Sequence, residues 1–160
     1  MTVGQAARTA TIANQTKVYG AYDPLLTSIT PTWGGLINRP SLSTFHGTVG
    51  TDDRSLTRSR TSLSRAAVEN VGSRSITGGT FSAASANYSA PSLTGTPSLT
   101  ISQAALTATI ANQTKVYGAD DPLLTSITPT LSGLINRPAV ATFNGTVGID
   151  DSLPTSTTTS

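Results

Sequence analysis

The chain has 160 residues, with ten Lys and Arg, eight Asp and Glu, one His and no Cys. The lack of cysteine excludes a thiol nucleophile, a disulfide framework and a cysteine-ligated metal site, and one histidine excludes a multi-histidine metal centre. Ser and Thr make up 49 residues, and this uncharged polar composition argues against a disordered tail, a helical bundle or a catalyst. It favours an extracellular β-structure.

The first predicted element is a turn followed by a short helix. Tyr19-Gly20 marks the turn, Asp23 has the chemistry of a helix N-cap, and Pro24 suits the first helical position. Leu25, Leu26 and Ile29 would then face inward. Further along, residues 44–45 and 47–50 predict a strand and its end.

Later segments alternate apolar and small polar residues, as half-buried strands do. Residues 74–82 predict a hairpin that turns at Gly78-Gly79. Residues 98–102 and 106–110 each predict a strand, the former with Leu99 and Ile101 on one face. The predicted fold is therefore all-β, a small sandwich or β-grasp-like repeat module, with at most one short helix after Asp23-Pro24 and after Asp121-Pro122.

An internal repeat dominates the sequence. Residues 2–53 match residues 100–151 without a gap, and 41 of these 52 positions are identical. A repeat at a fixed spacing, here 98 residues, indicates tandem duplication. We predict a complete repeat over residues 8–102, the first half of a second over 103–151, and a disordered tail over 152–160.

The repeat carries recognisable motifs in a fixed order. A Tyr-Gly-x-x-Asp-Pro motif occurs twice, followed by Leu-Ser-Arg-Ala-x-x-Glu-Asn-Val-Gly over residues 63–72, an Asn-Tyr pair at 87–88 and a Leu-Thr-Ile strand at 99–101. The residues of the first motif are Tyr19, Gly20, Asp23 and Pro24, and again Tyr117, Gly118, Asp121 and Pro122. In these motifs the chain resembles the MBG-type tandem repeats of large bacterial surface adhesins and filamentous-haemagglutinin-like proteins. The resemblance implies a mostly-β module that is repeated many times, is exported to the cell surface as a stalk or spacer, and has no catalytic residues.

Acidic residues occur in three pairs, Asp52-Asp53, Asp120-Asp121 and Asp150-Asp151. A calcium site needs six to eight oxygens from several segments, whereas adjacent aspartates on a strand point to opposite faces. Solvated turns therefore explain the pairs better than calcium does. We expect no cofactor, with calcium as the alternative.

One basic cluster is present, made of Arg54, Arg58, Arg60 and Arg65. The first three share even parity, so an extended strand would present them on one face to a polyanion or an anionic glycan. Charged side chains on an exposed edge strand also prevent aggregation, and no aromatic residues are interleaved. His46 becomes Asn144 in the second copy, which argues against a functional histidine.

The sequence thus predicts a non-catalytic stalk or spacer repeat of a bacterial cell-surface adhesin. The alternative is a glycan- or polyanion-binding module that uses the Arg54–Arg65 segment. Expected partners are neighbouring repeats of the same chain, with a host or matrix glycan as a further partner, and neither nucleic acid nor membrane insertion is expected. The first residues lack the apolar run of a signal peptide, so we expect an extracellular location as part of a longer exported protein.

The one copy of residues 54–102 cannot complete both half-repeats. Trp33, which is Leu131 in the second copy, gives the N-terminal half more apolar area to bury. We therefore expect residues 54–102 to pair with the N-terminal half. Residues 103–160 should then be less protected and should carry an unpaired strand edge.

Overall fold

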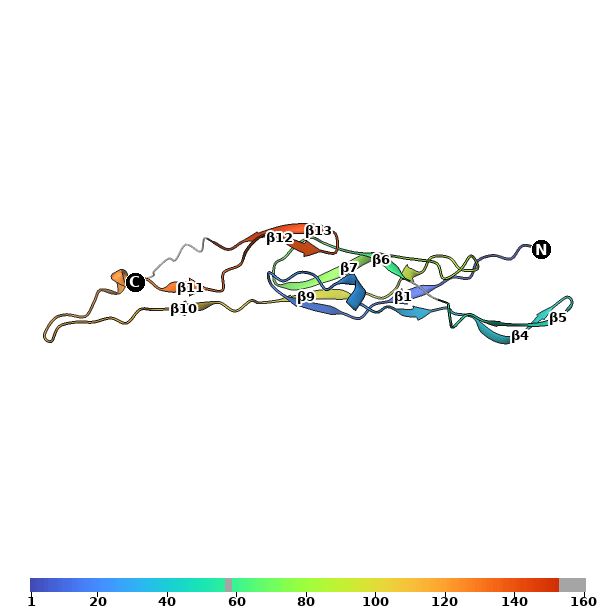
Figure 1. Ribbon diagram of the computed structural model, residues 1–160, viewed down its shortest axis with the longest axis horizontal. Coiled ribbons are helices and arrows are strands. Elements are labelled where there is room, and N and C mark those ends of the chain that lie inside the picture. The colour runs from blue at the N-terminus through green and yellow to red at the C-terminus, as the bar shows by residue number, and fades with distance from the viewer. Residues whose placement is uncertain (57–58, 153–160) are drawn as a thin grey trace.

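The computed structural model describes residues 1–56 and 59–152, whose elements lie along an elongated rod (Figure 1). Within these ranges the chain forms strands and two single turns of 3-10 helix, and no α-helix. The strands are β1 (Thr9–Thr11), β2 (Gln15–Val18), β3 (Thr32–Gly34), β4 (Asn38–Thr44), β5 (Gly47–Asp52), β6 (Arg60–Arg65), β7 (Gly72–Phe81), β8 (Ser92–Leu93), β9 (Ser98–Ser102), β10 (Thr107–Thr109), β11 (Thr130–Ser132), β12 (Asn136–Thr142) and β13 (Gly145–Asp150). The all-β prediction is confirmed. Across the described residues, no helix has the length and apolar character needed to cross a membrane.

The main body of the first repeat contains two sheets. The larger has the strand order β2-β9-β7-β6, and the smaller has the order β3-β1-β8. In both, the strand from the start of the repeat pairs in parallel with a strand from its end: β1 with β8, and β2 with β9. A parallel pair needs a long connection between its strands, and here that connection is nearly the whole repeat.

The core lies in this body. Leu99 and Ile101 of β9 are 0% and 1% exposed, which confirms the alternation predicted for residues 98–102. A second group of buried apolar side chains packs with Trp33, whose ring meets that of Phe81 edge-on at 5.6 Å. This group consists of Ala10, Ile12, Ile29, Leu63, Ile76 and Phe81.

Three local predictions were wrong. Residues 44–50, predicted as a strand and its end, contain the turn of the β4–β5 hairpin, in which Thr44 pairs with Gly47. The hairpin expected at Gly78-Gly79 does not form, because β7 continues through both glycines. A Cβ on Gly79 would lie only 3.0 Å from Leu63 Cδ2 and 3.1 Å from a carbon of the Phe81 ring. This glycine therefore gives room for close packing rather than for a turn.

The helix predicted after Pro24 is one 3-10 turn, η1 (Leu26–Ser28), and its counterpart is η2 (Leu124–Ser126). Leu25 occupies the N-cap position of η1 without a side-chain hydrogen bond, so Asp23 is not the predicted cap. Ile29 is buried as expected, whereas Leu25 is 74% exposed.

The two copies share residues 54–102 in an unexpected way. β8 and β9 pair with strands of the N-terminal copy, as predicted. The β12–β13 hairpin of the second copy nevertheless lies beside the same body, while the matching β4–β5 hairpin of the first copy extends away from it at one end of the rod (Figure 1). The expectation of an exposed second copy thus fits residues 107–134, most of which are exposed, but is wrong for the buried positions of β12–β13. Of the tail predicted over 152–160, residues 153–160 lie outside the described residues.

Candidate functional site: the junction between the two repeats

The β12–β13 hairpin joins the second repeat to the first through backbone and side-chain hydrogen bonds. Asp23 N donates to Ala141 O at 3.0 Å, and its carboxylate Oδ2 accepts from Phe143 N at 2.9 Å. Arg65 N donates to Asn144 Oδ1 at 3.1 Å. Val140, on the same hairpin, is 0% exposed. The first repeat therefore uses this hairpin as part of its own structure.

Four buried charges lie beneath the docked hairpin. Asp23 is held on both oxygens by Arg65, with Nε at 2.7 Å from Oδ2 and Nη2 at 2.6 Å from Oδ1. Lys17 Nζ lies 2.9 Å from Asp23 Oδ1 and 2.5 Å from Glu69 Oε2. Arg65 Nη2 also donates to Glu69 Oε1 at 2.5 Å. All four side chains are at most 4% exposed, and two positive and two negative charges cancel.

Hydrogen bonds keep Asp23 and Arg65 ionised despite their burial. Burial alone raises the pKa of the Asp23 carboxyl, but hydrogen bonds from Arg65 and Lys17 lower that pKa below its usual value. Burial alone lowers the pKa of the Arg65 guanidinium, and hydrogen bonds to Asp23 and Glu69 raise it instead. The ionised Asp23 can then accept the Phe143 N–H, so the charge network and the hairpin are linked through one carboxylate.

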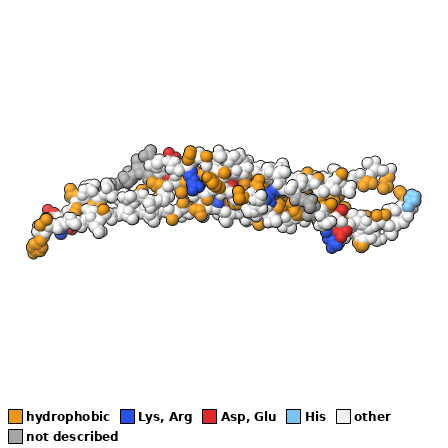
Figure 2. Space-filling view, viewed as in Figure 1, with side chains coloured by type: hydrophobic (Ala, Val, Ile, Leu, Met, Phe, Trp, Pro, Cys, Tyr) orange, Lys and Arg blue, Asp and Glu red, His pale blue; other side chains and the backbone are white. Residues whose placement is uncertain are grey.

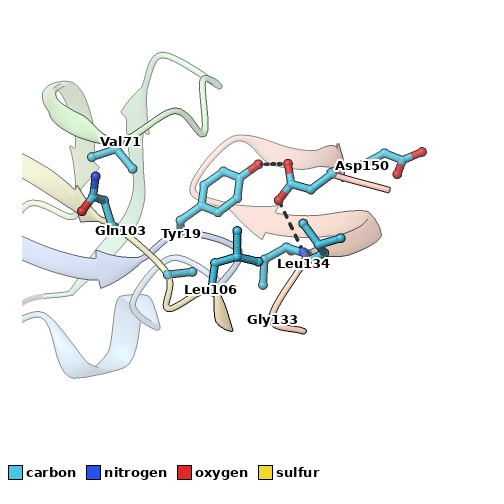
Figure 3. Close-up of a pocket in the computed structure, with 10 residues that line it drawn as sticks. Tyr19, Val71, Gln103, Leu106, Gly133, Leu134 and Asp150 are labelled. Atoms are coloured by element: carbon cyan, nitrogen blue, oxygen red, sulfur yellow. Dashed lines mark hydrogen bonds between the residues drawn. The ribbon is translucent and has the colours of Figure 1, made fainter. Parts of the chain in front are cut away.

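A tyrosine–aspartate contact closes the other end of the junction. Tyr19 OH donates to Asp151 Oδ1 at 2.8 Å, and Ile135 N donates to Asp151 Oδ2 at 3.4 Å (Figure 3). Burial, followed by the contact with Asp151, raises the pKa of Tyr19 to about 12. These two residues come from different repeats, so the bond ties one repeat to the next.

A cleft of about 650 Å³ lies at this contact, lined by residues of both repeats. Figure 3 shows Tyr19, Leu106 and Leu134 converging there. Gly20 lies next to the cleft with φ +80°, and a Cβ on it would lie 2.8 Å from an Ile135 methyl group. The glycine of the Tyr-Gly motif is therefore required both by its left-handed backbone and by the close approach of the next repeat.

Replacing Tyr19 with Phe should lower the free energy of unfolding by about 1 kcal/mol at pH 7, because a part-buried hydrogen bond between repeats is lost. Tyr117→Phe should leave the free energy of unfolding unchanged, since Tyr117, its counterpart, is fully exposed.

The pKa of Tyr19 is raised to about 12 from 10, so the contribution of Tyr19 to the free energy of unfolding is complete below pH 10 and disappears as the pH rises towards 12. Urea titrations between pH 7 and 12 measure both effects, and a Tyr19→Phe variant with the wild-type loss of stability above pH 10 would contradict this assignment.

The described arginines of the predicted basic cluster lie in different environments. Arg65 is buried at the junction, and Arg54 lies outside any strand, paired with Asp52 at 2.7 Å. Arg60 begins β6 and is half-buried, and this burial lowers the pKa of its guanidinium. Arg58 lies outside the described residues. Of the three arginines that the structure describes, Arg54 and Arg60 are thus placed where a solute can reach them.

The aspartate pairs contact protein groups instead. Tyr88 OH donates to Asp53 Oδ2 at 2.5 Å, and Asp150 accepts from Ser152 N at 2.9 Å. Asp121 pairs with Lys115 on the surface. Within residues 1–56 and 59–152, no three His, Asp or Glu side chains come together to hold a metal ion.

Sequence reasoning missed the charge network. It treated Asp23 as a helix cap and Arg65 as a surface cation, and it assigned no role to Lys17 or Glu69. A signal was present: in a chain with only 18 Lys, Arg, Asp and Glu, two charges of each sign fall in or beside its two most recognisable motifs.

The repeat motifs agree with a family model. The MBG domain (YGX type) model matches residues 9–100, which include Tyr19, Gly20 and all four network residues. No match was found among curated proteins, and none among solved structures. The model covers more than half of the chain, and the chain therefore belongs to the MBG domain family of the YGX type.

Proposed function

We propose that this chain is a structural stalk or spacer unit of a bacterial cell-surface adhesin, whose role is to transmit tension from one repeat to the next. MBG domains are non-catalytic repeat modules typical of bacterial surface proteins. This family context supports an extracellular location at the cell surface. What the geometry adds is a reason why the unit would resist extension.

The observation that carries the proposal is the parallel pairing of β2 with β9. Gln15 pairs with Leu99, and the register continues to Val18 with Ser102. Tension along the chain pulls β2 towards its N-terminus and β9 towards its C-terminus. Because the strands are parallel, these pulls are opposed along the strand axis, and all the hydrogen bonds of the ladder are loaded together instead of one after another.

The parallel β1–β8 pair lies before this ladder and is loaded in the same sense. Beyond the ladder, Tyr19 N donates to Ser102 O at 2.8 Å. The buried side chain of Lys17, on β2, forms ion pairs with Asp23 and Glu69. Tension applied to the ends of the repeat therefore loads these hydrogen bonds and ion pairs before it loads the segment between β2 and β9.

Single-molecule extension of the whole chain, held at its two ends, tests this proposal. We expect one dominant unfolding event in the wild type. Gln15→Pro should greatly reduce the force of that event. Gln15 has the same parity along the chain as Tyr19, whose N–H donates to Ser102 O, so proline removes a backbone donor that faces β9.

Gln113→Pro is the matched control. Gln113 is the equivalent residue of the second copy, lies outside any strand and is exposed, so the unfolding force should be unchanged. Equal forces for the wild type and Gln15→Pro, with both folded before extension, would contradict a mechanical role for the β2–β9 ladder. Saturable binding of heparin by the wild type, lost on replacing Arg54 and Arg60 together, would favour the polyanion-binding alternative instead.

A further inference from the structure

The two hairpins place equivalent residues in two different environments. Val140 is 0% exposed and Ile149 6%, whereas their counterparts Leu42 and Thr51 are only half-buried. The contrast is sharpest for the phenylalanine at the hairpin turn. Phe143 packs against the core of the first repeat, and Phe45 is 92% exposed. Figure 2 shows the single histidine, which follows Phe45, at the extreme end of the rod.

We propose that the β4–β5 hairpin is a docking element for a second copy of the first repeat, and that it binds the face formed by Lys17, Tyr19, Asp23, Arg65 and Glu69 of that copy. This inference rests on the proposed repeat function and names the partner surface. The β12–β13 hairpin, seated on that face in this chain, shows the geometry of the complex.

The backbone groups and the phenylalanine with which β12–β13 contacts the first repeat are retained in β4–β5. Asp23 contacts the backbone at Ala141 and Phe143, so Ser43 and Phe45 offer the same O and N–H. Phe45 also keeps the ring of Phe143. The two hairpins have matching registers, including the same irregularity between Arg39 and Leu42 and between Arg137 and Val140.

Two side-chain contacts can be reproduced as well. Asn144 accepts from Arg65 N through its amide oxygen, and His46 stands in its place with a ring nitrogen that accepts when neutral. Asp151 receives Tyr19 on Oδ1, whereas Asp53 receives Tyr88 on Oδ2. One aspartate can therefore bind a tyrosine of its own repeat and a tyrosine of the preceding repeat on different oxygens.

A smaller cleft marks where the second copy would meet the chain. It is lined by Gln5, Ala6, Ile37 and Asp53, which are the equivalents of Gln103, Ala104, Ile135 and Asp151 in the junction cleft. A cleft with four equivalent lining residues thus recurs 98 residues earlier, and Tyr88 also lines it.

The test is a chain extended by one repeat, in which residues 1–105 are followed by residues 8–160. This design keeps the whole docking face, native β9 and native Arg8. Amide exchange of residues 38–52 that follow the added copy should slow by about tenfold or more relative to the 160-residue chain, because docking removes local opening. In the extended chain, Phe45→Ala in that hairpin should restore fast exchange.

Phe45→Ala is also the control for folding. Phe45 is exposed in the 160-residue chain, so its removal should leave that chain as stable as the wild type. Unchanged exchange of residues 38–52 in the extended chain would overturn the inference. If the β2–β9 ladder still resists force in that case, the docking inference fails alone and the mechanical function stands.

Discussion

Replacing Asp23 with Asn should lower the free energy of unfolding by about 3–5 kcal/mol, the cost of removing one partner from a buried ion network. The substitution keeps the size of the side chain but leaves Lys17 and Arg65 facing Glu69 alone, so one buried positive charge is uncompensated. It also replaces an ionised acceptor of the Phe143 N–H with a neutral amide. Since small domains are stable by about 5–15 kcal/mol in total, this is a severe loss.

Asp121→Asn provides the control within the same chain. Asp121 is the equivalent residue of the second copy, and its side chain is 83% exposed and paired with Lys115. Surface pairs of this kind contribute at most about 1 kcal/mol. Urea unfolding at pH 7 compares the two variants, and losses that agree within experimental error would contradict a structural role for the network.

The pH dependence of stability gives an independent check on Asp23. Its pKa is lowered in the folded protein, so its stabilising contribution is complete above the normal carboxyl pKa of about 3.9. That contribution is lost as the pH falls through the lowered value. Asp23→Asn should therefore flatten the acid limb of the stability profile measured by urea unfolding.

Phe143→Ala should lower the free energy of unfolding by about 2 kcal/mol, somewhat less than the 3–5 kcal/mol typical of a fully buried phenylalanine, because Phe143 is half-buried. Its ring packs against the core of the first repeat. The loss should appear as destabilisation of the first repeat, although residue 143 belongs to the second. Such a result would show that the β12–β13 hairpin is part of the folded structure of the first repeat.

Phe45→Ala is the matched variant and should change stability by less than about 0.5 kcal/mol in the 160-residue chain, since Phe45 is 92% exposed. Thermal or urea unfolding followed by Trp33 fluorescence reports on the first repeat, because Trp33 packs in the same core cluster. Equal effects of the two alanine substitutions would show that the β12–β13 hairpin does not pack as described.

The sequence was sufficient for features that depend on local pattern. Alternation at Leu99 and Ile101 predicted β9 and its buried face, and the 98-residue shift located the repeat. Predictions from local pattern were wrong where the contacting residue lies far away in the sequence or where packing overrides turn chemistry. Gly78-Gly79 has the chemistry of a turn, yet Leu63 and Phe81 pack closely around Gly79 and keep the strand continuous.

The junction could not be predicted because its contacts join residues far apart in the chain. Asp23 and Phe143 are separated by 120 positions, and Tyr19 and Asp151 by 132. Taken as a local pattern, Asp23-Pro24 favours a helix cap. Asp23 becomes part of the charge network only because the fold brings Arg65 and the β12–β13 hairpin into contact with it. The two hairpins match at ten of fifteen positions, and the docked one has Ile149 where the free one has the more polar Thr51. Which repeat each hairpin packs against could not be predicted from local pattern.

The central claim, that the hairpin of one repeat is part of the repeat before it, is tested most directly by native-state hydrogen exchange in the 160-residue chain. The hairpins over residues 38–52 and 136–150 have closely similar sequences and registers, so each serves as the reference for the other. We expect amides of 136–150 to exchange as slowly as those of β7 and β9, and amides of 38–52 to exchange much faster. Equal protection of the two hairpins would contradict the account.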